Sequence, residues 1–155
     1  MKQEERMLKG LPYKITEDGL PEKHLAVLQK IYDYNLCRPD ETEKMDRLIR
    51  SILGKTGKQV HVEPPFRCDY GFNIEVGENF YSNYNLTILD CNKVTIGHHC
   101  LIGPNVSIIT VNHPQDRKLR SRDLEYATPV TIGNDVWMDA VPSSTLAFLS
   151  EIMSS

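Results

Sequence analysis

A polar stretch between two aliphatic runs contains the side chain with the clearest capacity for chemistry. Residues 111–129 open with Asn112-His113-Pro114 and continue through many charged residues. An unperturbed imidazole titrates near pH ~6.5, so at neutral pH it can take a proton from a weakly acidic group and return it. A lone loop histidine is more often solvated than catalytic, so residue type alone leaves both roles for His113 open.

The histidines also raise the possibility of a metal site. The clustered candidates are His98, His99 and His113, with His61 further away in the sequence. A metal-dependent hydratase of the carbonic-anhydrase kind needs three neutral imidazoles around one zinc ion. Adjacent residues of a coil wall face opposite sides, so His98 and His99 are expected to diverge. The sequence therefore predicts no metal site and makes these two residues solvent-facing corner residues.

Composition narrows the class of protein. The chain has 155 residues and a formal net charge of −3, which argues against nucleic acid or an anionic membrane as a partner. It has no apolar run of the ~18 residues typical of a membrane span, and the first ten residues do not resemble a signal peptide. We therefore expect a cytoplasmic protein. In that compartment the cysteines are expected to be small buried side chains rather than disulfides: Cys37, Cys68, Cys91 and Cys100.

The elements that must position His113 begin with two predicted helices in residues 1–57. The first covers residues 20–36, with an apolar stripe predicted from Leu25, Leu28, Ile31, Tyr32 and Leu36. The second starts with a predicted capping box of Asp40 and Glu43 and ends at Gly54 and Gly57. Its predicted stripe consists of Met45, Leu48, Ile49, Ile52 and Leu53.

From residue 58 a six-residue period replaces the helical one. Ile96-Gly97 and Ile102-Gly103 lie six residues apart, and Ile108 continues the phase. Val76-Gly77 and Ile132-Gly133 recur in similar settings, the latter 36 residues after Ile96-Gly97. A hexapeptide repeat predicts a parallel β-helix, in which each aliphatic residue points inward and stacks on its equivalents in adjacent coils. We therefore assign residues 58–139 to a β-helix, with 111–129 as a loop extruded from one coil.

Two long stretches resemble a known family. "VEPPFRCDYGFNIEVGENFYSNYNLTILDCNKVTIGHHCLIGPNVSIITVNHP" and "PVTIGNDVW" are similar to the maltose and galactoside O-acetyltransferases, which belong to the hexapeptide-repeat acyltransferases. "YKITEDGL" and the two helices resemble the leading segment of this family. The resemblance covers about residues 5–137. It implies a mainly β fold, a left-handed parallel β-helix preceded by short N-terminal α-helices, assembled as a homotrimer with active sites between subunits. It also implies acetyl transfer from acetyl-CoA to a sugar hydroxyl.

The resemblance assigns roles to individual residues. His113 matches the catalytic general base, and Asn83 matches an asparagine that stabilises the oxyanion and contacts acetyl-CoA. Asp69 and Asp90 match positions lining the acceptor pocket, and Tyr81 supplies an apolar face for the sugar ring. Trp137 matches a tryptophan beside the acetyl-CoA tunnel. Each of these residues also has a purely structural interpretation. Asn83 and Asp90 could satisfy the corners of a coil, Tyr81 could belong to the core, and Trp137 could cover the edge of the last coil.

The resemblance stops after Trp137. The family continues there with further coils that build much of the acetyl-CoA site, whereas residues 140–155 show no six-residue phase and form an atypical tail. The sequence therefore predicts weak binding of acetyl-CoA. It leaves two main hypotheses: a sugar O-acetyltransferase that uses acetyl-CoA, and a catalytically impaired or silent hexapeptide-repeat protein that acts only through subunit or sugar binding.

Overall fold

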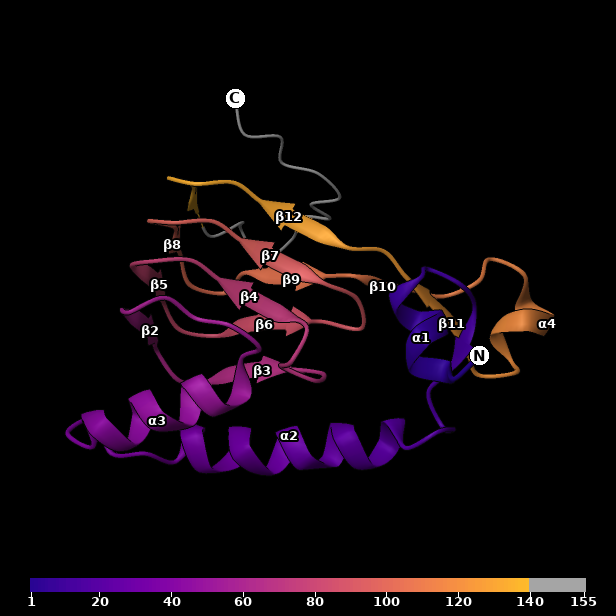
Figure 1. The fold of residues 1–155 in the computed structure, drawn as a ribbon, viewed down its shortest axis with the longest axis horizontal. Helices are drawn as coiled ribbons and strands as arrows, with labels where there is room; N and C mark the ends of the chain where they lie inside the picture. Colours follow the sequence, from indigo (N-terminus) through magenta and orange to yellow (C-terminus); the bar gives the residue numbers. More distant parts are fainter. Residues whose placement is uncertain (140–155) are drawn as a thin grey trace.

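The computed structural model describes residues 1–139, which form a parallel β-helix with helices at one end and a hairpin projecting from its side (Figure 1). The predicted tail, residues 140–155, lies outside the described residues. The chain winds through three strands per coil, and each strand pairs in parallel with its equivalent in the next coil. The repeat period thus folds as the sequence predicts.

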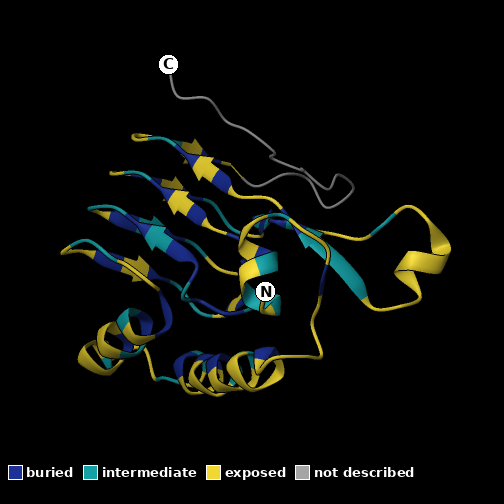
Figure 2. Ribbon diagram, turned by 45° about the vertical axis from the view of Figure 1, so that its right-hand side comes forward, coloured by how far each residue is buried: buried dark blue, intermediate teal, exposed yellow. Residues whose placement is uncertain are grey.

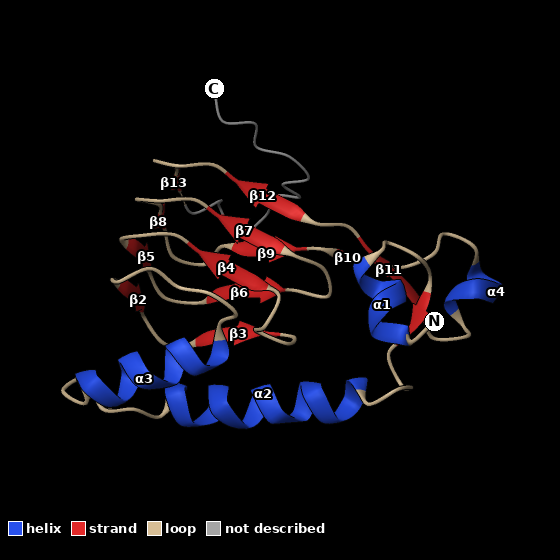
Figure 3. Cartoon of the chain, viewed as in Figure 1, coloured by secondary structure: helices blue, strands red, loops and turns tan. Residues whose placement is uncertain are grey.

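Three parallel sheets form the walls of the β-helix (Figure 3). The first consists of β4 (Ile74–Val76), β7 (Val94–Ile96) and β12 (Val130–Ile132). The second consists of β2 (Val60–Val62), β5 (Phe80–Ser82), β8 (Leu101–Ile102) and β13 (Trp137–Met138). The third consists of β3 (Phe66–Cys68), β6 (Leu86–Leu89) and β9 (Ser107–Ile109).

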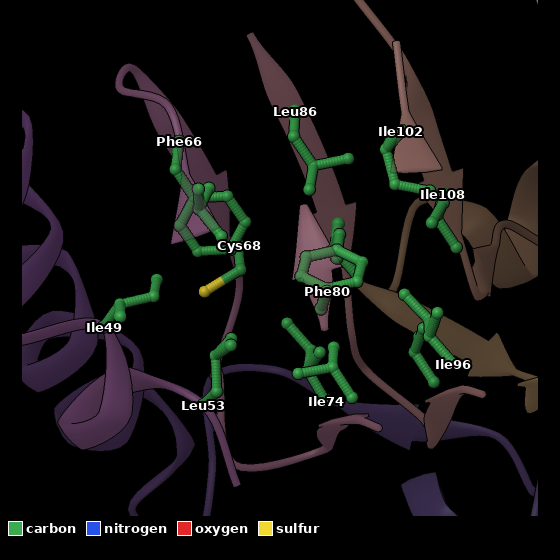
Figure 4. Close-up of a cluster of buried hydrophobic side chains, with 14 of the residues drawn as sticks. Ile49, Leu53, Phe66, Cys68, Ile74, Phe80, Leu86, Ile96, Ile102 and Ile108 are labelled. Carbon is green, nitrogen blue, oxygen red and sulfur yellow. The ribbon is translucent and has the colours of Figure 1, made fainter. Parts of the chain in front are cut away.

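The core is a stack of aliphatic side chains from successive coils. Val76 lies opposite Ile96, and Ile96 opposite Ile132, in the registers predicted from the repeat. Figure 4 shows isoleucine, leucine and phenylalanine side chains from all three walls meeting in the interior. The middle residue of most strands faces outward, as Thr95 does in β7. Each fully buried Ile contributes about 1.5–3 kcal/mol, so the stack is the main source of stability.

The glycines of the repeat are required by the close stacking of the corners. A Cβ atom at Gly97 would lie 2.3 Å from Asn134 Oδ1 and 2.7 Å from the backbone carbon of Gly133. A Cβ atom at Gly77 would lie 2.6 Å from His98 Nδ1. His98 and His99 themselves lie at an exposed corner, where Nδ1 of His98 accepts a hydrogen bond from the backbone N–H of Glu78. The predicted corner position of both histidines is confirmed.

The two long helices pack against the first coil, and the predicted stripe of the first of them is only partly correct. α2 (Leu20–Asn35) has one buried and one exposed side (Figure 2), and its buried residues are Leu20, Val27, Ile31 and Tyr34. Of the predicted stripe, Ile31 is buried and Leu28 half-buried, whereas Leu25, Tyr32 and Leu36, the residue after the helix, are exposed. Two apolar stripes of helical spacing share Ile31 on this helix, and packing against α3 (Thr42–Ile52) and β3 selects the stripe that also contains Val27 and Tyr34. The described part of the chain has no helix long and apolar enough to cross a membrane.

The second helix confirms its predicted stripe but not its predicted cap. α3 (Thr42–Ile52) buries Met45, Ile49 and Ile52. It begins one residue later than the capping box requires, and its N-cap, Glu41, makes no side-chain capping hydrogen bond. The carboxylate of Glu41 instead accepts a hydrogen bond from the backbone N–H of Arg38. The Glu41 side chain therefore binds the turn before the helix instead of capping the helix.

The extruded segment is a structured hairpin rather than a plain loop. It contains β10 (Val111–Asn112), the short helix α4 (Arg117–Arg120) and β11 (Leu124–Ala127). β11 also pairs antiparallel with β1 (Tyr13–Lys14), a strand that the sequence analysis missed. The N-terminal segment, which also carries α1 (Gln3–Leu8), therefore completes a small sheet with a hairpin more than 100 residues away.

A buried asparagine joins these distant segments. Asn92 lies at a corner of the coil, and its Nδ2 group donates to the backbone oxygens of Met7, Leu8 and Ala127 at 3.1, 3.3 and 2.9 Å. It thereby connects the end of α1, the end of β11 and the coil. This corner carries the candidate site.

Candidate active site

A cavity of about 450 Å³ lies where the N-terminal segment, α2, one coil corner and the hairpin meet. Its polar wall is formed by His24, Asp69, Cys91, His113 and Glu125, and apolar residues such as Leu20, Leu89 and Val111 complete it. Two residues predicted from the sequence, His113 and Asp69, therefore face the same space. A smaller hollow, also bounded by His113 and Glu125, adjoins it.

His113 lies at the mouth of the cavity beside a carboxylate. Its Nδ1 atom is 3.9 Å from Glu125 Oε1; the His113 side chain is 60% exposed and that of Glu125 only 15%. The distance is longer than a hydrogen bond, and an exposed imidazole can close it by a small rotation. A carboxylate at Nδ1 leaves Nε2 as the nitrogen free to accept a proton.

Glu125 is itself held by the N-terminal segment. The hydroxyl of Tyr13, which is fully buried, donates to Glu125 Oε2 at 3.0 Å. Burial raises the pKa of Tyr13 far above its usual range, so this hydroxyl stays protonated and remains a donor. Tyr13, Glu125 and His113 thus form a chain of contacts from the protein interior to the cavity.

Asp69 lines the cavity as a partly desolvated carboxyl group. Burial raises its pKa, and a hydrogen bond from the Cys91 thiol, 3.3 Å from Oδ2, opposes that rise. Burial raises the pKa of the Cys91 thiol as well, which keeps the thiol a donor. A carboxyl group in this setting accepts hydrogen bonds from hydroxyl groups.

Asp90 lies behind the cavity wall and does not line it, in contrast to its predicted position. It is fully buried, and its Oδ1 atom accepts hydrogen bonds from the backbone N–H groups of Asp69 and Tyr70 at 3.0 and 2.9 Å. Burial raises its pKa to about 6, although these two hydrogen bonds favour the charged form. Asp90 therefore holds the turn that presents Asp69.

The other predicted site residues lie on a different part of the surface. Tyr81 is on the outer side of β5, where its ring stacks on His61 with centroids 5.6 Å apart, and in register with Leu101 of β8. Leu101 is in turn in register with Trp137, which is 73% exposed. Asn83 begins the next corner, where its Oδ1 accepts from the backbone N–H of Tyr84 at 2.8 Å.

The fold of the single chain does not bring these two groups of residues together. The four-residue strand β6 separates the Asn83 corner from the corner beside the cavity, a span of about 13 Å at ~3.3 Å per residue. Asn83 and His113 are therefore too far apart to act on one carbonyl group within a single chain.

The sequence analysis assigned no site role to three polar residues that line the cavity, His24, Cys91 and Glu125, or to Tyr13, which lies behind Glu125. Tyr13 and Glu125 are 112 residues apart, and His24 contacts Asp69 across 45 residues. No local spacing signals such pairs. The sequence offered one signal for Glu125: it is an acidic residue in the same extruded segment as His113.

The described residues offer no set of three histidine, cysteine or acidic side chains that could hold a metal ion. The rings of His98 and His99 have centroids 6.3 Å apart, and Nδ1 of each ring makes a hydrogen bond to a residue of the neighbouring corner, Glu78 or Asn79. The four cysteines, all within the described residues, are free thiols.

Comparison with known proteins gives the class of the fold. Residues 6–57 match the maltose acetyltransferase hexapeptide capping motif. A crystal structure of a maltose O-acetyltransferase from Clostridium difficile 630 superposes with a TM-score of 0.88 at 40% identity, covering 90% of this chain and 74% of that one. The fold is the left-handed parallel β-helix of the hexapeptide-repeat acetyltransferases, as the resemblance implied.

Further relatives place the chain in one family. It is 42% identical to the galactoside O-acetyltransferase of Escherichia coli (strain K12) over 134 residues, 86% of this chain. A structure of a galactoside acetyltransferase in complex with coenzyme A has a TM-score of 0.86 at 42% identity, covering 88% of this chain and 68% of that one. The chain belongs to the maltose and galactoside O-acetyltransferase family. It spans 66% and 56% of the lengths of the first two curated relatives that it matches.

Proposed function

We propose that this chain is an O-acetyltransferase that transfers the acetyl group of acetyl-CoA to a sugar hydroxyl, with His113 as general base. The observation that carries the proposal is the cavity in which His113 faces Asp69, with Glu125 beside Nδ1 of the imidazole. Its relatives, named galactoside and maltose O-acetyltransferases, supply the reaction class.

In this mechanism His113 Nε2 removes the proton of the acceptor hydroxyl as that oxygen bonds to the thioester carbonyl carbon. Glu125 stabilises the resulting imidazolium. The carbon–sulfur bond then breaks, and His113 returns its proton to the leaving thiolate. No side chain of the protein needs to act as a nucleophile.

A neighbouring subunit would complete the site. The chain is proposed to form a homotrimer in which the Tyr81, Asn83 and Trp137 surface of one subunit faces the His113 cavity of the next. Asn83 Nδ2 donates no hydrogen bond within residues 1–139, so it is available to stabilise the oxyanion. Trp137, strongly exposed, would then lie against acetyl-CoA, and the exposed Leu101 beside it would become buried.

The acceptor side involves both parts of the chain. Residues 1–57 are proposed as a segment that covers the first coil and also supplies cavity residues, and residues 58–139 as the β-helix that carries the base. Asp69 would bind a sugar hydroxyl, and Asp90 would fix the position of Asp69 from behind. The proposed partners are a sugar and acetyl-CoA, with no nucleic acid or membrane, and the proposed location is the cytoplasm.

An acetyl-transfer assay tests the proposal. The purified chain is incubated with acetyl-CoA and either maltose or a methyl galactoside, and free thiol is measured. His113→Ala should lower the rate about 10²- to 10⁴-fold, the typical contribution of a general base. Gln115→Ala, an exposed change in the same hairpin, serves as control. Sugar binding without any turnover would instead favour the silent hexapeptide-repeat protein.

A further inference from the structure

His24, which has no role in the mechanism above, faces the same cavity as His113. It lies in the second turn of α2, near the end of the helix that points toward the hairpin (Figure 1). Its side chain is half-buried, and the edge of its ring packs against Tyr70 with centroids 5.9 Å apart. The imidazole is therefore fixed on the cavity wall, in contrast to the exposed imidazole of His113.

One hydrogen bond determines which nitrogen of His24 carries a proton. Its Nδ1 atom is 2.7 Å from the backbone oxygen of Asp69. A carbonyl oxygen only accepts hydrogen bonds, so Nδ1 must be the donor. In the neutral ring, Nε2 is then an acceptor, and it lies on the side of the ring away from Asp69 O. No partner for Nε2 is present among residues 1–139.

The same contact ties His24 to a second acceptor residue of the cavity wall, Asp69. The backbone of Asp69 is held at its N–H group by Asp90 and at its oxygen by His24. The carboxyl group of Asp69 and Nε2 of His24 are thus fixed on one wall of the cavity, while His113 and Glu125 belong to the hairpin. Two fixed acceptors on one wall suit a ligand that offers two neighbouring hydroxyl donors.

We propose that His24 is an acceptor-binding residue that sets specificity: its Nε2 accepts a hydrogen bond from a sugar hydroxyl next to the one that reacts. Asp69 accepts from a second hydroxyl, so the cavity selects pyranose rings with an adjacent pair of hydroxyls in suitable orientation. The inference depends on the proposed function and adds a residue from α2 to its acceptor site.

Two substitutions separate this role from a purely structural one. His24→Asn keeps a donor at the Nδ1 position, so the hydrogen bond to Asp69 O can remain, but it removes the acceptor at Nε2. His24→Gln places an amide at the Nε2 position and removes the anchor to Asp69. His98→Asn removes an exposed imidazole at a distant corner and serves as the matched control.

The expected result is a change in KM for the sugar alone. His24→Asn should raise that KM about 3- to 10-fold, the range for one neutral hydrogen bond, while kcat, KM for acetyl-CoA and Tm stay near wild type. His24→Gln should recover part of the sugar affinity and lose some thermal stability. His98→Asn should change neither KM.

Nuclear magnetic resonance of the imidazole nitrogens gives a readout that does not need turnover. Free protein should show His24 protonated at Nδ1, and addition of maltose or methyl galactoside should shift the Nε2 resonance. An unchanged sugar KM in His24→Asn, or no shift at Nε2 under saturating sugar, would overturn the inference while the acetyltransferase proposal stands. Absence of both acetyl transfer and sugar binding in the wild type would overturn both.

Discussion

The stacked coils and the cavity corner of this protein are built by opposite means. In the coils, Val76, Ile96 and Ile132 repeat one role at a fixed register, and each depends on near-identical neighbours. At the corner, the contacts do not repeat from coil to coil, and several join distant segments, as between Tyr13 and Glu125 or Asn92 and Met7. Stability therefore comes from repetition, whereas the candidate chemistry lies where the repeat is interrupted and the N-terminal segment returns to meet it.

The largest change in stability should come from a substitution that creates a cavity in the coil stack. Ile96→Ala removes a buried side chain between two stacked equivalents, which should lower the free energy of unfolding by about 2–5 kcal/mol. Thermal or urea unfolding measures it. Thr95→Ala, on the outer side of the same strand, is the control and should change stability by no more than about 0.5 kcal/mol. Equal effects of both changes would contradict the assignment of stability to the inward stack.

At the cavity corner, removal of the buried carboxyl group of Asp90 should raise the free energy of unfolding, by somewhat less than the loss expected for Ile96→Ala. The folded-state pKa of Asp90 is raised from 3.8 to about 6, so its favourable contribution is present below pH ~4 and is lost as pH rises through about 6. Asp90→Asn does not titrate and should be more stable than wild type at pH 7 by about 2–3 kcal/mol.

The pH dependence separates this effect from a general stabilisation. The difference in Tm between Asp90→Asn and wild type should grow between pH 4 and pH 6, and should level off above that range. Asp40→Asn, an exposed change, should show no such trend. A strong rise in sugar KM in Asp90→Asn at unchanged Tm would show that Asp90 binds the acceptor directly and would break the division proposed here.

The smallest expected changes, mainly in kcat, should come from substitutions of Glu125 and Tyr13, the residues behind His113. Glu125→Gln keeps the size of the side chain but loses the charge that stabilises the imidazolium, so kcat should fall about 10-fold with little change in Tm. Tyr13→Phe removes one hydrogen bond to Glu125, which should lower kcat less and reduce stability by about 1 kcal/mol. Glu5→Gln in the same N-terminal segment is the control.

A steady-state assay and a thermal melt on the same preparations measure both effects. Wild-type kcat in Glu125→Gln would remove Glu125 from the mechanism and leave His113 without a positioning partner. That result would also weaken the idea that the N-terminal segment contributes to catalysis.

The repeat made the β-helix predictable, because one spacing rule applied to Ile96, Ile102, Ile108 and Ile132 alike. The choice of buried face on α2 was not predictable, since Leu25 and Val27 belong to competing stripes and only packing against α3 and β3 decides between them. The site was partly predictable: His113 and Asp69 share the cavity, Asp90 supports it from behind, and Tyr81, Asn83 and Trp137 lie on a separate surface.

The sequence alone therefore determined the coil, its register, the inward aliphatic residues and the place where the repeat is interrupted, because each follows from local spacing. Tertiary structure alone decided that Tyr13 pairs with β11, that His24 binds the backbone of Asp69, and that Glu125 lies beside His113. The first two contacts join segments 112 and 45 residues apart, and they form because the N-terminal segment folds back over the coil corner that buries Asn92. The contact between Glu125 and His113 lies within one hairpin, and the pairing of β10 with β11 brings its two sides together.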